Sequence, residues 1–218
     1  MNPKTAILIG ATGLTGGILL TLLLKDSSYS KIKIFGRNSC QKSHPKIEEH
    51  LGDLFKLETF AEAFKGDVVF CCIGTTKAKT PNKETYKKID CGIPVAAAKL
   101  AKRNKIETFE VISVLGADVN SNTFYNSVKG EMERDVLAIG LKNSYIFQPS
   151  LIGGDRDEKR LGEKIAQVSF KFFDFVIVNK YKMIAAETIA KAMLLVAKNG
   201  YEETRIESHQ IKNISDRG

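Results

Sequence analysis

The stretch AILIGATGLTGG, residues 6–17, decides the fold. It contains a strand-sized apolar run, then a glycine-rich turn, then the start of a helix-sized apolar run. A pyrophosphate binds to bare backbone N–H groups at the positive end of a helix, and glycines make that approach possible. Gly10 permits the tight turn, Gly13 leaves room for the phosphates, and Gly16 lets the helix pack closely on the strand. The pattern predicts a dinucleotide-binding turn with contacts from Gly10, Thr12, Gly13, Leu14, Thr15 and Gly16.

Two other interpretations of this stretch are open. The same glycines could form a structural turn that binds nothing. Residues 5–24 also carry no charge, and their length suits a signal peptide or a membrane span. Because the glycines divide the apolar residues into a strand-sized and a helix-sized piece, we expect a strand, a turn and a helix, and no transmembrane segment.

Strand-like and helical patterns alternate along the rest of the chain. The predicted strands cover residues 6–9, 31–35, 47–51, 67–73, 108–113, 144–147 and 205–211, and the predicted helices 14–25, 57–64, 83–104, 123–139, 163–173 and 185–198. This alternation predicts an α/β fold, a Rossmann-type doubly wound parallel sheet with a small C-terminal substrate-side cap. We expect a single NAD(P)-binding Rossmann domain over residues 1–218, with the cap elements within 150–183. Such sheets bind ligands at the carboxyl ends of their strands.

The composition excludes several classes of protein. A chain of 218 residues, 43% of them apolar, buries enough surface to fold without disulfides or metals. The four cysteines form no C-x-x-C pair and the three histidines are scattered, so we expect no metal site. The net charge of +8 invites a nucleic-acid partner, but the lysines are dispersed, and their densest stretch, 77–88, contains a proline. We therefore expect a cytoplasmic protein that binds no nucleic acid.

The end of the second predicted strand selects between the two nicotinamide cofactors. NAD sites usually place an acid there for the ribose 2′-hydroxyl, whereas NADP sites often place an arginine for the 2′-phosphate. Residues 34–38 read IFGRN, and no acid lies between residues 32 and 40. We assign Arg37 to the 2′-phosphate and predict that NADP(H) is preferred over NAD(H); an exposed surface arginine is the alternative. Asp53 and Leu54, after the third strand, would lie near the adenine, unless Asp53 only caps a helix.

A Y-x-x-x-K pattern follows the fifth predicted strand. Tyr125 and Lys129 share one face of a helix, so the ammonium can lower the pKa of the phenol and help it to exchange a proton during hydride transfer. Ser113 ends the fifth strand, where its hydroxyl can bond the same substrate oxygen. Tyr29 and Lys33 have the same spacing but straddle a loop and a strand. The alternative is a capping serine beside a surface Tyr/Lys pair.

The chain resembles an atypical short-chain dehydrogenase/reductase, and within that superfamily it is most similar to the Tat-interacting-protein-like NADPH-binding oxidoreductases. The stretches that carry the resemblance are ILIGATGLTGG, IFGRN, VVFCCIGTT, VISVLGAD, FYNSVKGEME and IFQPSLIGGDR, which together span residues 7–156. Two positions depart from the family's pattern. Val114 stands where a second serine is frequent, and Gln148 stands where an arginine often precedes the proline.

The resemblance implies further site residues. Gly74, Thr75 and Thr76 would lie against the ribose and adenine side of the cofactor. Pro149 and the backbone of residues 150–152, which include Leu151 and Ile152, would flank the nicotinamide. Ser113 would take the serine role, Tyr125 the acid/base role, and Lys129 the ribose-binding role, so that Tyr125 and Lys129 also contact the cofactor.

Two functions fit these residues. The first is an NADP(H)-dependent oxidoreductase that transfers hydride to or from a small carbonyl or alcohol through the Ser113, Tyr125 and Lys129 set. The second is a non-catalytic NADPH-binding protein that regulates or senses redox state through a protein partner. An intact catalytic set favours the enzyme but does not name a substrate.

Overall fold

Seven parallel strands form the centre of the molecule. A computed structural model describes residues 3–153 and 183–218. The strands are β1 (Lys4–Ile9), β2 (Tyr29–Gly36), β3 (Ile47–Leu51), β4 (Val68–Cys71), β5 (Thr108–Ile112), β6 (Asn143–Gln148) and β9 (Arg205–Glu207). Their order in the sheet is β3-β2-β1-β4-β5-β6-β9, and every neighbouring pair is parallel. This is the strand order of a doubly wound dinucleotide-binding sheet, so the predicted fold class is confirmed.

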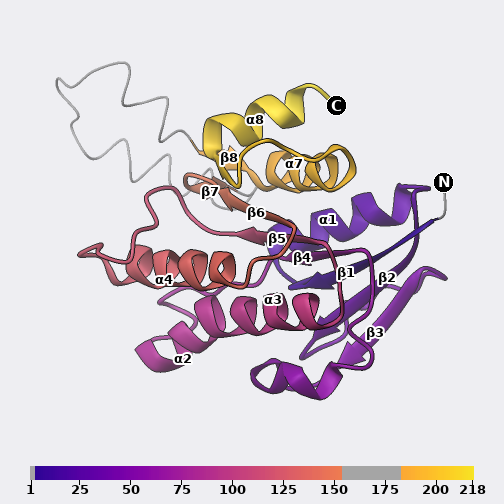
Figure 1. Cartoon of the computed structure of the whole chain (residues 1–218), viewed down its shortest axis with the longest axis horizontal. Helices are drawn as coiled ribbons and strands as arrows, with labels where there is room; N and C mark the ends of the chain where they lie inside the picture. The colour runs from indigo at the N-terminus through magenta and orange to yellow at the C-terminus, as the bar shows by residue number, and fades with distance from the viewer. Residues whose placement is uncertain (1–2, 154–182) are drawn as a thin grey trace.

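Helices cover both faces of this sheet (Figure 1). On one face lie α1 (Leu14–Lys25), α7 (Ala186–Asn199) and α8 (Ser208–Asp216), and on the other α2 (Lys83–Lys87), α3 (Ile93–Arg103) and α4 (Phe124–Ala138). A separate apolar core fills each layer. Strands that helices cover on both faces of the sheet have continuous apolar sequences. All four residues of β4, for example, are buried.

The direction of winding changes at β1. The chain passes from β1 to β2 and β3 on one side, and then crosses to β4, which pairs with the other side of β1. The loops after β1 and β4 therefore leave the sheet in opposite directions and open a crevice at the carboxyl ends of the strands.

The strand β2 begins at Tyr29, so Tyr29 and Lys33 both lie in this strand, and the expectation that they straddle a loop and a strand is wrong. Three further predicted elements differ from the structure. The strand expected at 205–211 ends at Glu207, because Glu207 and Gln210 form a capping box that starts α8. The helix expected at 57–64 is instead a 3₁₀ segment, η1 (Leu54–Phe60), capped by Asp53. The helix expected at 83–104 contains one π-helical turn, η2 (Lys88–Gly92), immediately before α3.

The predicted cap is only partly within the described residues. A two-stranded parallel sheet, β7 (Ile152–Gly153) with β8 (Ile184–Ala185), lies beside the main sheet. The helix expected at 163–173 lies outside the described residues. Within 3–153 and 183–218, no helix combines the length and the apolarity that a membrane crossing requires.

Candidate cofactor and catalytic site

The turn between β1 and α1 depends on its glycines in three different ways. Gly10 has φ +91°, and a Cβ there would lie 2.7 Å from the backbone of Cys72. A Cβ on Gly16 would lie 2.2 Å from the carbonyl oxygen of Gly10, so Gly16 lets α1 approach β1. Gly13 differs, because its φ is an ordinary −80° and a Cβ there would meet only the Gly10 oxygen, at 3.2 Å. Gly13 therefore keeps space open in front of the turn.

The N-terminus of α1 suits an anion. Gly13 is its N-cap and provides no side-chain hydrogen bond, and the first turn contains no acidic residue. The first backbone N–H groups of a helix have no partner within the helix, and the helix dipole favours negative charge beside them. A pyrophosphate fits this arrangement without displacing a side chain.

A cleft of about 570 Å³ opens at this turn. Eight of the predicted cofactor residues line it: Gly10, Thr12, Gly13, Arg37, Asp53, Leu54, Gly74 and Thr75. The remaining ones lie outside its lining: Leu14, Thr15, Gly16, Thr76, Tyr125, Lys129, Pro149, Leu151 and Ile152. The cleft thus gathers the residues predicted for the adenosine half of the cofactor, and it does not extend to those predicted for the nicotinamide half.

The cleft has a cationic rim and an apolar wall. Arg37 is exposed at the end of β2, and Lys79, from the loop after β4, also lines the cleft. Among the described residues, neither side chain has an ion-pair partner. Ile73, Ile89 and Ile93 line the cleft with Leu54 and Phe55, which suits the flat face of a base.

Asp53 combines the two roles that the sequence left open. Its carboxylate accepts a hydrogen bond from the backbone N–H of Phe55 at 3.0 Å and so caps η1. The same residue lines the cleft. Asp53 therefore caps η1, and its position in the cleft is also compatible with the predicted adenine site.

Lys129 is held by a buried carboxylate that the sequence did not indicate. Its side chain is 4% exposed, and Nζ lies 3.1 Å from Oδ1 of Asp90. Nζ also donates to the carbonyl oxygen of Ile112, the residue before Ser113, at 3.2 Å. Asp90 lies on the π-helical turn η2, and its second oxygen accepts the backbone N–H of Thr75 at 2.9 Å. The Lys129–Asp90 ion pair thus connects the lysine to Thr75 in the wall of the cleft. Single π-helical turns such as η2 are frequent at functional sites.

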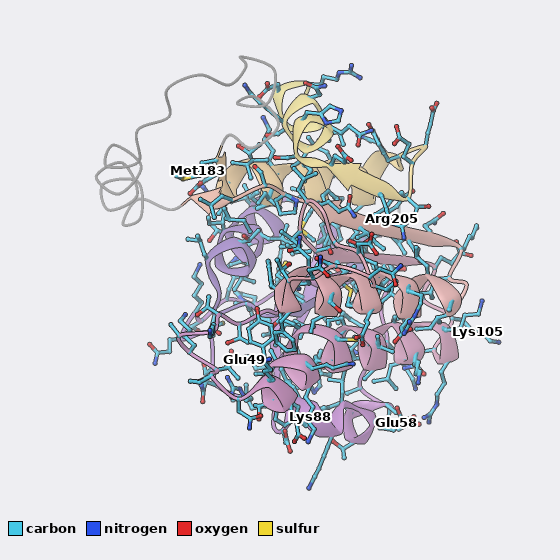
Figure 2. The ribbon with its side chains drawn as sticks, turned by 90° about the vertical axis from the view of Figure 1, so that its left-hand side faces the viewer. Glu49, Glu58, Lys88, Lys105, Met183 and Arg205 are labelled. Atoms are coloured by element: carbon cyan, nitrogen blue, oxygen red, sulfur yellow. The ribbon has the colours of Figure 1, made fainter. Side chains whose placement is uncertain are left out.

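Ser113 is only 2% exposed, and its hydroxyl lies 2.5 Å from Oε1 of Glu133 on α4. Glu133 also accepts from Gln148 Nε2, at 2.8 and 3.0 Å, and from Arg205 Nε at 2.8 Å. The serine is therefore part of a buried polar network, with Arg205 at its half-exposed end on the edge strand β9 (Figure 2).

Tyr125 lies in the first turn of α4 and is 40% exposed, with its ring edge-on to Tyr86 at 6.5 Å between centroids. Burial of its hydroxyl raises the pKa of Tyr125; Lys129 acts in the opposite direction, and Asp90 adds to the rise. The sequence-based expectation of a lowered pKa is thus wrong, because desolvation and the unforeseen Asp90 outweigh the lysine. In the described part of the chain, no hydrogen bond joins two of Ser113, Tyr125 and Lys129; the backbone of Ile112 links the serine and the lysine.

A second cavity, of about 460 Å³, lies at the amino ends of the strands. Lys4, Asp67, Lys105 and Glu107 line it, together with the end of α7. It contains none of the predicted site residues and none of the glycine-turn geometry, so we place the candidate site at the carboxyl ends.

Comparison with known proteins identifies the family. The family described as NAD(P)H-binding matches residues 10–172. Protein HTATIP2 of Rattus norvegicus is 32% identical over 198 residues, covering 89% of this chain and 81% of that protein. Protein FMP52, mitochondrial, of Candida albicans is 32% identical over 170 residues, covering 75% of this chain and 74% of that protein.

Solved structures share the fold at low sequence identity. The Bordetella bronchiseptica enzyme WbmH, in complex with NAD⁺, superposes with a TM-score of 0.71 at 15% identity, covering 94% of this chain and 76% of that one. UDP-glucose 4-epimerase of Thermotoga maritima, with UDP-glucose, gives 0.68 at 12% identity, covering 97% and 82%.

These matches agree with the sheet order and with the glycine turn described above. They confirm the resemblance to short-chain dehydrogenase/reductase-like proteins that the sequence motifs carry. The chain belongs to the NAD(P)H-binding family and is a relative of the HTATIP2 and FMP52 proteins.

Proposed function

We propose that the chain is an NADP(H)-dependent oxidoreductase that reduces a small carbonyl compound or oxidises the corresponding alcohol. The observation that carries the proposal is the cleft at the β1–α1 turn, which combines an open phosphate position at Gly13 with the exposed guanidinium of Arg37. Lys79 adds a second positive charge to the same cleft and supports the preference for the phosphorylated cofactor.

The assigned residues divide the work of binding and proton transfer. NADPH, when bound, supplies the hydride. Gly10, Gly13 and the first turn of α1 hold the phosphates, and Asp53, Leu54 and Gly74 to Thr76 surround the adenosine. Pro149, Leu151 and Ile152 border the nicotinamide side. Lys129 has three N–H donors and, among the described residues, uses two, on Asp90 and Ile112, so the third is assigned to a ribose hydroxyl.

Tyr125 is the proton donor in this proposal. A tyrosine phenol carries its proton at neutral pH and can donate it to the oxygen of a carbonyl that receives hydride. The half-exposed position of the side chain leaves it accessible to a small substrate.

Cofactor choice tests the Arg37 assignment. A guanidinium–phosphate hydrogen bond is worth ~1.5–3 kcal/mol, so Arg37→Ala should weaken NADPH binding by ~10–150-fold and leave NADH binding nearly unchanged. Fluorescence titration of both cofactors measures the two affinities. The control is Arg103→Ala, which removes a surface arginine at the end of α3. Equal affinities of the wild type for NADPH and NADH contradict the assignment.

Turnover tests the reaction. NADPH consumption, followed at its absorbance band across a panel of aldehydes and ketones, should exceed the rate without carbonyl. Tight NADPH binding without reduction of any member of the panel would favour the regulatory alternative.

One observation favours that alternative, a protein that responds to NADPH and acts through a partner. Val119, Phe124 and Leu151 are 36%, 38% and 54% exposed. All three come after the carboxyl ends of β5 and β6, on the side of the sheet where the candidate site lies, and a partner protein bound there would cover them.

The broader predictions stand as part of the proposal. We propose one domain over residues 1–218, no nucleic-acid partner and a cytoplasmic location. The FMP52 relatives carry the word mitochondrial in their names. Fluorescence microscopy of the tagged chain, with a mitochondrial marker, decides between the two compartments.

A further inference from the structure

Glu133 is the most heavily bonded buried acid around the candidate site. It is 2% exposed and lies on α4, one turn after Lys129. Three side chains from three different strands or strand ends bond to its carboxylate: Ser113 after β5, Gln148 on β6 and Arg205 on β9. The network therefore connects the serine of the site to the edge of the sheet.

The chemistry of these partners fixes the direction of each hydrogen bond. An ionised carboxylate only accepts, whereas the Gln148 amide nitrogen and the Arg205 guanidinium only donate. The 2.5 Å contact between Ser113 and Glu133 then needs the proton of the serine hydroxyl. A serine has one such proton, so Ser113 presents only lone pairs to anything else that it contacts.

Arg205 supplies the positive charge that pairs with Glu133. Lys129, one turn earlier on α4, is paired with Asp90, and Arg134, the next residue on α4, is paired with Asp135. Gln148 carries no charge. In residues 3–153 and 183–218, Arg205 is the cation that pairs with Glu133, and a buried acid without such a partner is strongly disfavoured as an ion.

We propose that Arg205 is a positioning residue: through Glu133 it holds Ser113 as a hydrogen-bond acceptor. The inference rests on the proposed function. It makes Tyr125 the sole proton donor of the set, and Ser113 the group that accepts a hydrogen bond from the substrate hydroxyl in the alcohol form.

Three variants test this inference. Arg205→Ala removes the cation, Arg205→Lys keeps the charge but loses the planar donor, and Arg103→Ala removes a matched guanidinium. Arg205 and Arg103 are 51% and 53% exposed, and each pairs with one glutamate, but Glu58, the partner of Arg103, lies on η1, away from Ser113.

Crystal structures of the variants provide a readout that needs no turnover. In Arg205→Ala the carboxylate of Glu133 should turn toward the water that replaces the guanidinium, and the distance from Ser113 Oγ to both Glu133 oxygens should exceed about 3.5 Å. In Arg103→Ala the contact should persist. A retained Ser113–Glu133 bond in Arg205→Ala overturns the inference.

Kinetics separates positioning from a loss of stability. Arg205→Ala should lower kcat by about 10–100-fold, because small displacements of a reacting group are costly, with the Kd for NADPH within about twofold of wild type. Arg205→Lys, or methylguanidinium added to Arg205→Ala, should restore part of kcat. Unchanged kcat, or equal loss in Arg103→Ala, overturns the inference. If the wild type reduces no carbonyl, the proposed function fails, and the crystal structures still decide the role of Arg205.

Discussion

At the scale of single residues, Tyr125 separates catalysis from binding. Phenylalanine keeps the ring and its edge-on contact with Tyr86 but removes the proton that the proposed reaction transfers. Tyr125→Phe should reduce turnover on any accepted carbonyl by ~100–10,000-fold, the usual contribution of a general acid. Its affinity for NADPH should hardly change, since Tyr125 lies outside the lining of the adenosine cleft. Steady-state kinetics and fluorescence titration measure the two effects.

The matched control for this variant is Tyr201→Phe. Tyr201 lies between α7 and β9, away from the cleft, and its backbone N–H donates to the hydroxyl of Tyr145. It should keep both turnover and binding. Normal turnover in Tyr125→Phe would show that another group supplies the proton.

Glu110 makes the stability of the protein depend on pH. It is fully buried in β5, and neither of its carboxylate oxygens has a hydrogen-bond partner in the described part of the chain. Burial raises the pKa of Glu110 well above its usual value. Above ~4.3, the unfolded chain releases this proton while the folded chain retains it, so the free energy of unfolding should fall by ~1.4 kcal/mol per pH unit up to the folded pKa.

Glu110→Gln should remove this pH dependence. The control is Glu107→Gln, which should leave it in place, because the side chain of Glu107, three residues earlier, is 62% exposed. Urea denaturation of all three proteins at about pH 5 and about pH 7 measures the difference. The account of Glu110 is wrong if the wild type and Glu110→Gln lose stability in parallel as the pH rises.

At the scale of elements, two glycines of the β1–α1 turn have different roles: Gly13 leaves room for the cofactor phosphates, and Gly16 allows α1 to pack on β1. Gly13→Val places its side chain in open space before the turn and should abolish NADPH binding while the circular dichroism spectrum is retained. Gly16→Val would drive a Cβ to 2.2 Å from the Gly10 oxygen and should destabilise the fold itself. Thermal unfolding and fluorescence titration of both variants separate these effects, and normal NADPH binding by folded Gly13→Val would exclude this turn as the phosphate site.

Elements with a simple periodic signal could be predicted from the sequence. The helix at Leu14–Lys25 and the strand at Ile47–Leu51 have the predicted bounds. The strand predicted at 205–211 is too long, because the apolar residues Ile206 and Ile211 suit a strand, whereas Glu207 and Gln210 form a capping box that starts α8. The π turn at Lys88–Gly92 was missed, because a π turn leaves no periodic signal in a single sequence.

At the scale of the whole molecule, the place of the site could be predicted but not its buried charges. The glycine pattern and Arg37 indicate phosphate binding from the sequence alone, and residues of the turn line the same cleft as Arg37. Asp90 and Glu133 lie on helical segments where an acid usually faces solvent, so only the packing of distant elements shows that they hold Lys129 and Ser113. Lys79, in the basic stretch at 77–88, also lines the cleft, and no motif in the sequence singles it out.

A crystal structure of the chain with NADP⁺ tests the central claim most directly. The pyrophosphate should lie on the backbone N–H groups at the start of α1, the 2′-phosphate within hydrogen-bond distance of Arg37, and the nicotinamide beside Tyr125. A nucleotide bound with its 2′-phosphate in solvent, or with its nicotinamide directed away from Tyr125, would contradict the account.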